Sequence, residues 1–159
     1  MNIDHHARGG AAVGVLNRMS AWEANLVLNL RLWCEGPEGQ EQVWSEYRRA
    51  LAGDDAKREC RTFETLLRSL IDAAHRPMVR HEVGCGCLGA DEGIFLNLVR
   101  TASDGHLRDA ALIATLIVGP AYAEQIAMLA AHVGECARKI HKNSTEYPTQ
   151  TAPTGILLH

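Results

Sequence analysis

Glycine and proline residues divide this chain into segments that are each long enough for a helix of a few turns. Gly36-Pro37, Gly53-Asp54, Pro77 and Gly119-Pro120 mark divisions of this kind, because proline disrupts a helix when it lies inside one. None of the segments alternates cleanly enough to indicate a strand. Helices joined by short connections pack near antiparallel. We therefore predict an all-α fold, an irregular bundle of about five to six helices.

The apolar residues inside these segments recur at helical spacing. Ser20 and Glu23 have the spacing of a capping box, in which two side chains bond free amides at a helix start. Asp91 is a suitable N-cap for the fourth helix. The segment 106–118 is so apolar in its second half that we expect it to lie centrally. The third helix carries the clearest stripe, formed by Cys60, Phe63, Leu67, Leu70, Ile71 and Ala74.

A chain of 159 residues has enough volume for one continuous core. We expect residues 1–19 to form a flexible leader and residues 20–142 to form a single helical domain. Residues 143–159 are expected to form a C-terminal tail that is poorly ordered or docked against a neighbour.

Composition narrows the class of protein. A formal net charge of -3 argues against a general nucleic-acid binder, which carries an excess of Lys and Arg. No apolar run is long enough to cross a bilayer, and the N-terminus does not resemble a signal peptide. We therefore predict a cytoplasmic protein that binds neither nucleic acid nor membrane. Its odd number of cysteines, 5, favours free thiols or a metal site over a disulfide framework.

The segment 80–89, with the sequence RHEVGCGCLG, lies between the third and fourth predicted helices. Packing does not account for two thiols in a glycine-rich loop. Zinc binds four thiolate or imidazole ligands in a tetrahedral array. Cys85 and Cys87 can supply two of them and His81 a third, while the glycines free backbone amides to bond the sulfur atoms.

The fourth ligand must come from outside this loop. Cys34, at the end of the first helix, is the first candidate, and His75 is the second. Asp91 and Glu92 would then accept hydrogen bonds around the site. We therefore predict a structural zinc site formed by His81, Cys85, Cys87 and Cys34, whereas Cys60 and Cys136 lie on apolar stripes and belong to the core.

Two functions from different classes follow from this loop. In the first, the protein is a metal-stabilised binding or regulatory module, and metal binding contributes to the free energy of folding. A closed site of this kind is not catalytic. Its partner is another protein or a second copy of the chain.

The second function is thiol–disulfide exchange by Cys85-Gly86-Cys87, because a strained disulfide is easily reduced. The helix start at Asp91 favours a thiolate, but the negative charges of Asp91 and Glu92 oppose it.

A third hypothesis is an interaction module that uses Trp33, Trp44 and Tyr47 as an exposed surface. We expect, however, that these aromatic side chains pack in the core.

Overall fold

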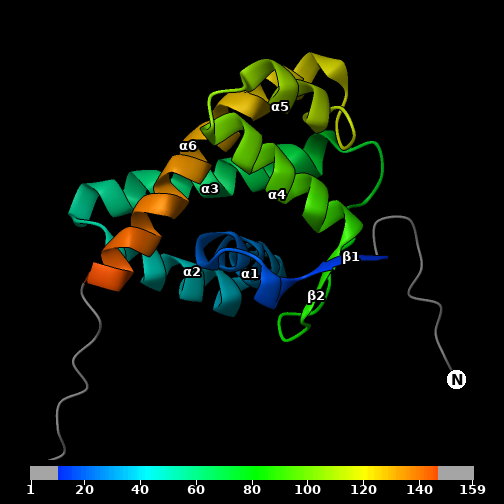
Figure 1. The fold of residues 1–159 in the computed structure, drawn as a ribbon. Helices are drawn as coiled ribbons and strands as arrows, with labels where there is room; N and C mark the ends of the chain where they lie inside the picture. The colour runs from blue at the N-terminus through cyan, green and yellow to red at the C-terminus, as the bar shows by residue number, and fades with distance from the viewer. Residues whose placement is uncertain (1–10, 147–159) are drawn as a thin grey trace, which may run out of the picture.

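The computed structural model describes residues 11–146, which form a predominantly helical fold (Figure 1). The helices are α1 (Ala21–Glu35), α2 (Pro37–Ala50), α3 (Gly53–Ala73), α4 (Ala90–Ser103), α5 (Leu107–Ala114) and α6 (Pro120–Glu146). The strands are β1 (Ala12–Val15) and β2 (Cys87–Gly89), and a 3-10 turn covers Leu16–Arg18. The predicted helical bundle is confirmed, and its Cys/His loop lies between α3 and α4 as expected.

The helix boundaries follow the sequence signals closely. The predicted capping box is present at the start of α1, where the Ser20 amide donates a hydrogen bond to Glu23 Oε2 at 3.3 Å. Pro37 occupies the first turn of α2, where its missing N–H costs nothing. α3 ends at Ala73, before Pro77. Local signals of capping and chain breaking therefore set most of the boundaries.

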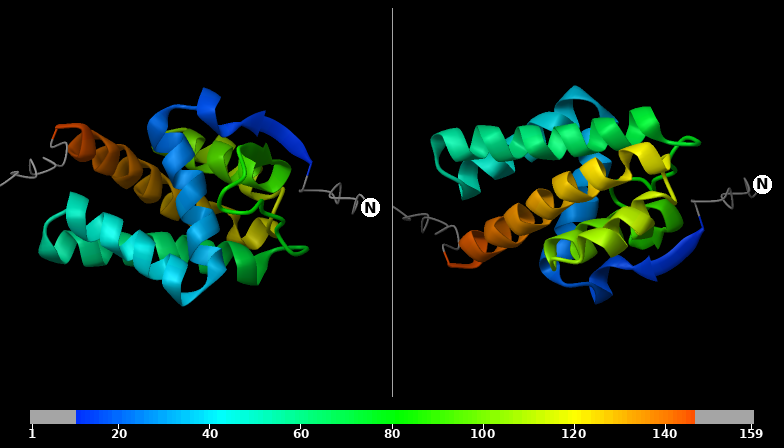
Figure 2. Two further views of the ribbon diagram at one scale, coloured as in Figure 1. Left: turned by 90° about the horizontal axis from the view of Figure 1, so that it is seen from below. Right: turned by 90° about the horizontal axis from the view of Figure 1, so that it is seen from above.

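The longest helix, α6, forms the centre of the packing. It contacts α3, α4 and α5, while α1 packs mainly against α2 and also touches α4 and α6 (Figures 1 and 2). Phe63, Phe95 and Ile126 are buried between these helices. No helix within residues 11–146 is both long and apolar enough to cross a membrane.

The cysteines and aromatic residues of the core lie where the periodicity places them. Cys60 and Cys136 are buried, and burial raises the pKa of each thiol to about 12. Trp33 and Tyr47 are buried as well, and Trp44 is half-buried with its indole N–H donating to Glu64. These aromatic side chains therefore stabilise the core and do not form an exposed binding surface.

The two strands are absent from the sequence-based prediction. Within the expected leader, Ala12 pairs with Gly89 and Val15 pairs with Cys87 in an antiparallel ladder. The Leu16 amide also donates to the Gly86 carbonyl at 2.9 Å. Strands of four and three residues are too short for an alternating pattern to show. Their pairing attaches the N-terminal segment to the Cys/His loop.

Two predictions of burial are wrong. The segment 106–118 was expected to be central, but α5 ends at Ala114 and lies at one end of the molecule (Figure 1). Leu112 and Leu116 are 67% and 61% exposed. Ile71, placed on the inward stripe of α3, is also exposed. The preceding residue, Leu70, is buried. Because successive side chains on a helix point about 100° apart, Ile71 faces away from the core.

Close packing between α4 and α6 depends on Gly134. A Cβ atom at this position would lie 2.6 Å from Ser103 Cβ and 3.0 Å from Val99 Cγ1. We expect Gly134→Ala to lower the free energy of unfolding by about 1–2 kcal/mol, because overpacking outweighs the better helix propensity of alanine. Urea denaturation measures the change. Gly119→Ala is the control, since its Cβ would meet only Tyr122 at 3.8 Å; equal effects of both variants would contradict the close approach.

Candidate functional site

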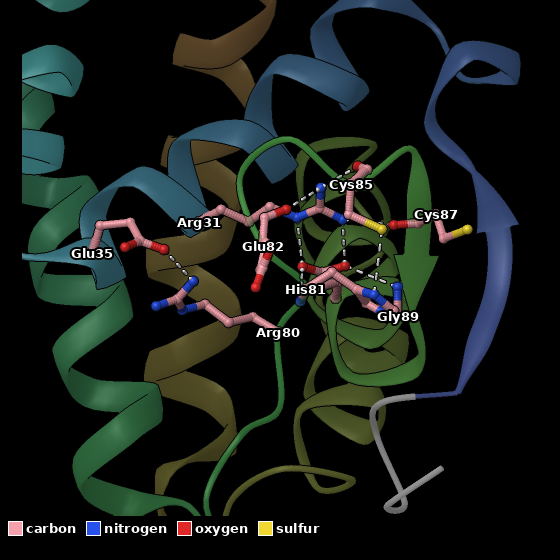
Figure 3. Close-up of polar contacts among 9 residues, drawn as sticks. Arg31, Glu35, Arg80, His81, Glu82, Cys85, Cys87 and Gly89 are labelled. Atoms are coloured by element: carbon pink, nitrogen blue, oxygen red, sulfur yellow. Dashed lines mark hydrogen bonds and ion pairs between the residues drawn. The ribbon is translucent and has the colours of Figure 1, made fainter. Parts of the chain in front are cut away.

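A buried arginine from α1 holds the Cys/His loop in shape. The Arg31 side chain is 0% exposed and directs its guanidinium into the loop (Figure 3). Its Nη1 donates to the Cys85 carbonyl at 2.6 Å and to the Glu82 carbonyl at 3.2 Å, and its Nη2 donates to the Cys87 carbonyl at 2.6 Å. Because every one of these acceptors is a main-chain oxygen, Arg31 fixes the path of the loop backbone.

The remaining donors of Arg31 bind Glu92 in the first turn of α4. Arg31 Nε lies 2.7 Å from Glu92 Oε1, and Nη2 lies 2.9 Å from Oε2. The same carboxylate accepts the His81 amide at 3.0 Å and the Gly89 amide at 2.8 Å. A guanidinium has five N–H donors and a carboxylate about four acceptor sites. Both groups are therefore saturated with hydrogen bonds, as a buried ion pair requires.

A second carboxylate of α4 holds the start of the loop. Asp91 is buried, and both of its oxygens bind the Arg76 guanidinium, at 2.7 and 2.8 Å. Asp91 Oδ2 also accepts the Val79 amide at 2.8 Å. The N-cap of α4 is Gly89, so the prediction of Asp91 as N-cap is wrong by two positions. Its carboxylate binds a distant segment of the chain where a cap was expected.

Burial and hydrogen bonding have opposite effects on the pKa values of the two carboxyl groups, Asp91 and Glu92. Burial acts to raise the pKa of Glu92, but hydrogen bonds from Arg31 and from two backbone amides outweigh it and leave the pKa below its ordinary value. The pKa of Asp91 is lowered in the same way by Arg76 and the Val79 amide, against burial. The hydrogen bond to Glu92 raises the pKa of Arg31. Both ion pairs are therefore charged at neutral pH.

The loop places one imidazole beside one thiol. His81 Nδ1 lies 3.6 Å from Cys85 Sγ, and the side chain of Cys87 points away from both (Figure 3). Cys85 and Cys87 are half-buried and hold no disulfide. His81 Nε2 is buried and has no hydrogen-bond partner among residues 11–146. Arg80, next to His81, pairs with Glu35 at 2.8 Å and so ties the loop to the end of α1.

The predicted zinc ligands are only partly brought together. Within residues 11–146, no three His, Cys, Asp or Glu side chains lie close enough to hold one metal ion. Cys34 faces the loop through its carbonyl, which is 3.5 Å from Arg80 Nη2, and burial raises the pKa of its thiol. His75 Nε2 lies 3.4 Å from the Thr115 carbonyl. The residues as placed do not assemble the ligand set, and the zinc site stays a prediction.

Sequence reasoning missed Arg31 and Arg76, the cations that neutralise the two acids. Asp91 and Glu92 were expected to accept hydrogen bonds around a metal site; the hydrogen bonds that they accept come from arginines and backbone amides. One signal for Arg31 is its position among Leu30, Leu32 and Trp33, since a charge in an apolar helix segment needs a buried partner.

No protein-family model, curated protein or solved structure matches this chain. The function of the chain is therefore inferred from the geometry of the loop.

Removal of the Arg31 side chain tests its role in the fold. Arg31→Met leaves Glu92 charged and buried and removes the donor to the carbonyls of Glu82, Cys85 and Cys87. We expect a loss of about 3–5 kcal/mol in the free energy of unfolding, the usual cost of breaking a buried pair. Arg48→Met, which breaks the exposed pair with Glu41, should cost less than about 1 kcal/mol. Chemical denaturation compares the two; similar losses would contradict the proposed role of Arg31.

Acid should weaken the same network. Because the pKa of Glu92 in the folded state lies below its ordinary value of 4.5, its contribution to stability is complete above that pH and is lost as pH falls through the folded pKa. We expect the free energy of unfolding to decline below about pH 4.5. Glu92→Gln should show a shallower decline in the same denaturation series, and an unchanged slope would contradict the coupling.

Proposed function

We propose that the Cys/His loop is a thiol–disulfide exchange site in which Cys85 is the attacking thiol. The observation that carries this proposal is the contact of 3.6 Å between Cys85 Sγ and His81 Nδ1. With Nδ1 unprotonated, the imidazole accepts the thiol proton and leaves the thiolate, which is the nucleophilic form. This arrangement of nucleophile and base is the usual one for an activated cysteine.

The electrostatic surroundings of the loop favour this chemistry more than the sequence indicated. Negative charge from Asp91 and Glu92 had counted against a thiolate, but each carboxylate is paired with a guanidinium. Arg31 additionally binds the carbonyls of both loop cysteines, which places its positive charge near them. The net charge beneath the loop is therefore balanced, and opposition from the acids is largely removed.

The exchange proceeds in two steps that balance without a further reagent. The Cys85 thiolate attacks one sulfur of a substrate disulfide, forms a mixed disulfide and releases the first substrate thiolate. The Cys87 thiolate then attacks Cys85 Sγ, closes the Cys85–Cys87 disulfide and releases the second. The substrate is reduced to two thiols while the loop is oxidised.

Closing the loop disulfide requires the Cys87 side chain to turn towards Cys85. The glycines beside the cysteines favour this movement, because a Cβ atom at Gly84 or Gly86 would meet nothing within 4 Å. The Cys87 side chain thus turns in open space beside the glycines, while the main chain stays held. Arg31 holds the main-chain carbonyls of both cysteines, so the oxidised loop is strained, and strained disulfides are readily reduced again. These features support a reversible cycle.

Reaction with an aromatic disulfide reagent tests the proposal. We expect the reduced wild-type chain to release two equivalents of aromatic thiolate rapidly, one for each step. Cys85→Ser should abolish this fast phase. Cys87→Ser should stop at a mixed disulfide on Cys85, visible as a mass adduct. His81→Ala should slow the first step roughly tenfold or more, because a positioned imidazole contributes at least that much to proton transfer.

Cys34→Ser is the matched control, since Cys34 is also half-buried but has no imidazole partner in the loop, and it should leave the fast phase unchanged. Elemental analysis of the same preparation measures bound zinc. One zinc ion per chain, with loop thiols that react only after chelation, would contradict the exchange site and support the predicted metal module. Equal reactivity of Cys34 and Cys85 would also contradict it.

A further inference from the structure

Exposed apolar side chains gather on one part of the molecule. The large hydrophobic residues that are exposed within residues 11–146 number eight, and five of them fall between positions 107 and 128. These five are Leu107, Leu112, Leu116, Tyr122 and Met128. They belong to α5, to its connection with α6, and to the first turns of α6. Scattered exposed apolar residues are ordinary, but three of these five, Leu107, Leu112 and Met128, line one groove, and an apolar group of this kind marks a surface that another molecule covers.

A groove runs through this surface between α5 and α6. Its volume is about 620 Å³. On the α5 side it is lined by Leu107, Ala111 and Leu112, and on the α6 side by Ala127 and Met128. The exposure of Leu112 follows from the placement of α5 at the edge of the bundle, where α4 and α6 cover only part of it. The groove thus has an apolar floor and two helical walls.

One charged residue stands on each wall of the groove, and the two have opposite signs. Arg108 of α5 and Glu124 of α6 both line it and are exposed. Neither forms an ion pair with any side chain in the described part of the chain. An apolar strip with an unpaired cation on one side and an unpaired anion on the other is complementary to itself. A twofold axis through it brings each cation to the anion of the other copy.

We propose that the α5–α6 groove is the interface of a symmetric homodimer. In a twofold interface the same surface is used by both copies, so that residue i meets residue j and residue j meets residue i. Leu112 and Met128 of each chain then cover the groove of the other, and Arg108 of each chain pairs with Glu124 of the other. α5 and the Cys/His loop lie at different ends of the molecule (Figure 1), so the dimer leaves the loop open.

The composition of the groove agrees with interfaces of this kind. Apolar side chains form most of its lining, and they are also typical of the buried centre of a stable contact. Met128 is unbranched and adapts its shape readily to a facing surface. The opposite charges of Arg108 and Glu124 fix the relative orientation of the two copies, because a shift of register separates each cation from its anion.

Sedimentation equilibrium of the full chain over a concentration series tests the dimer. We expect a mass of twice the 17.4 kDa of one chain. Arg108→Glu and Glu124→Arg should each weaken the dimer by about tenfold or more, since each places like charges opposite one another. The double variant Arg108→Glu/Glu124→Arg should restore dimerisation, because the charges again match across the twofold axis.

Arg61→Glu supplies the matched control, because Arg61 is exposed on α3 and undergoes the same change of charge outside the groove. It should leave the dimer intact. Leu112→Gln should also produce monomers, while its circular dichroism spectrum stays that of the wild type. A wild-type chain that remains monomeric at every concentration would overturn the proposal. So would a dimer in which neither charge reversal changes the association constant, or one that the double variant fails to restore.

Discussion

The buried ion pair between Arg31 and Glu92 determines how the rest of this site is built. It joins α1 to the start of α4 across 61 positions of sequence, and every polar atom in it has a partner. Removing a guanidinium and a carboxylate from water costs several kcal/mol per ion, which only a fully hydrogen-bonded arrangement offsets. Here the carbonyls of the loop and the amides of His81 and Gly89 complete that arrangement. The loop and the ion pair therefore stabilise each other, and neither keeps its geometry alone.

The helices were largely predictable, since their causes are local. Ser20 and Glu23 cap α1 within a single turn, and Pro37 and Pro120 begin α2 and α6. The partner of Arg31 was not predictable, because the nearest acid in the sequence, Glu35, pairs with Arg80 instead, and Glu92 lies 61 positions away. The same limit explains α5: its apolar sequence specifies a helix, but the number of neighbours that cover a helix depends on tertiary packing. The spacing of apolar residues thus predicts where the helices are, but it does not predict which face of a short apolar helix is covered by neighbours.

The candidate site shows the same division between local and distant causes. The glycines and thiols of segment 80–89 marked it correctly as an unusual loop, and the contact between His81 and Cys85 joins residues four positions apart. The expected metal geometry depended on Cys34, whose sulfur is positioned by the end of α1 and not by the loop. Asp91 and Glu92 were expected to oppose thiolate formation, but each is paired with an arginine from elsewhere in the chain. The net charge around a thiol therefore cannot be predicted from the residues next to it in the sequence alone.

The long separation between Arg31 and Glu92 also affects how the protein is made. During synthesis from the N-terminus, α1 leaves the ribosome well before α4, and Arg31 stays in water until its partner emerges. The Cys/His loop is translated between them, so its thiols are present before the structure that shapes them. Domains generally complete folding once their distant contacts can form. A nascent or truncated chain that lacks α4 would carry the same cysteines without the imidazole held beside them, so the exchange chemistry proposed for the loop requires the finished domain.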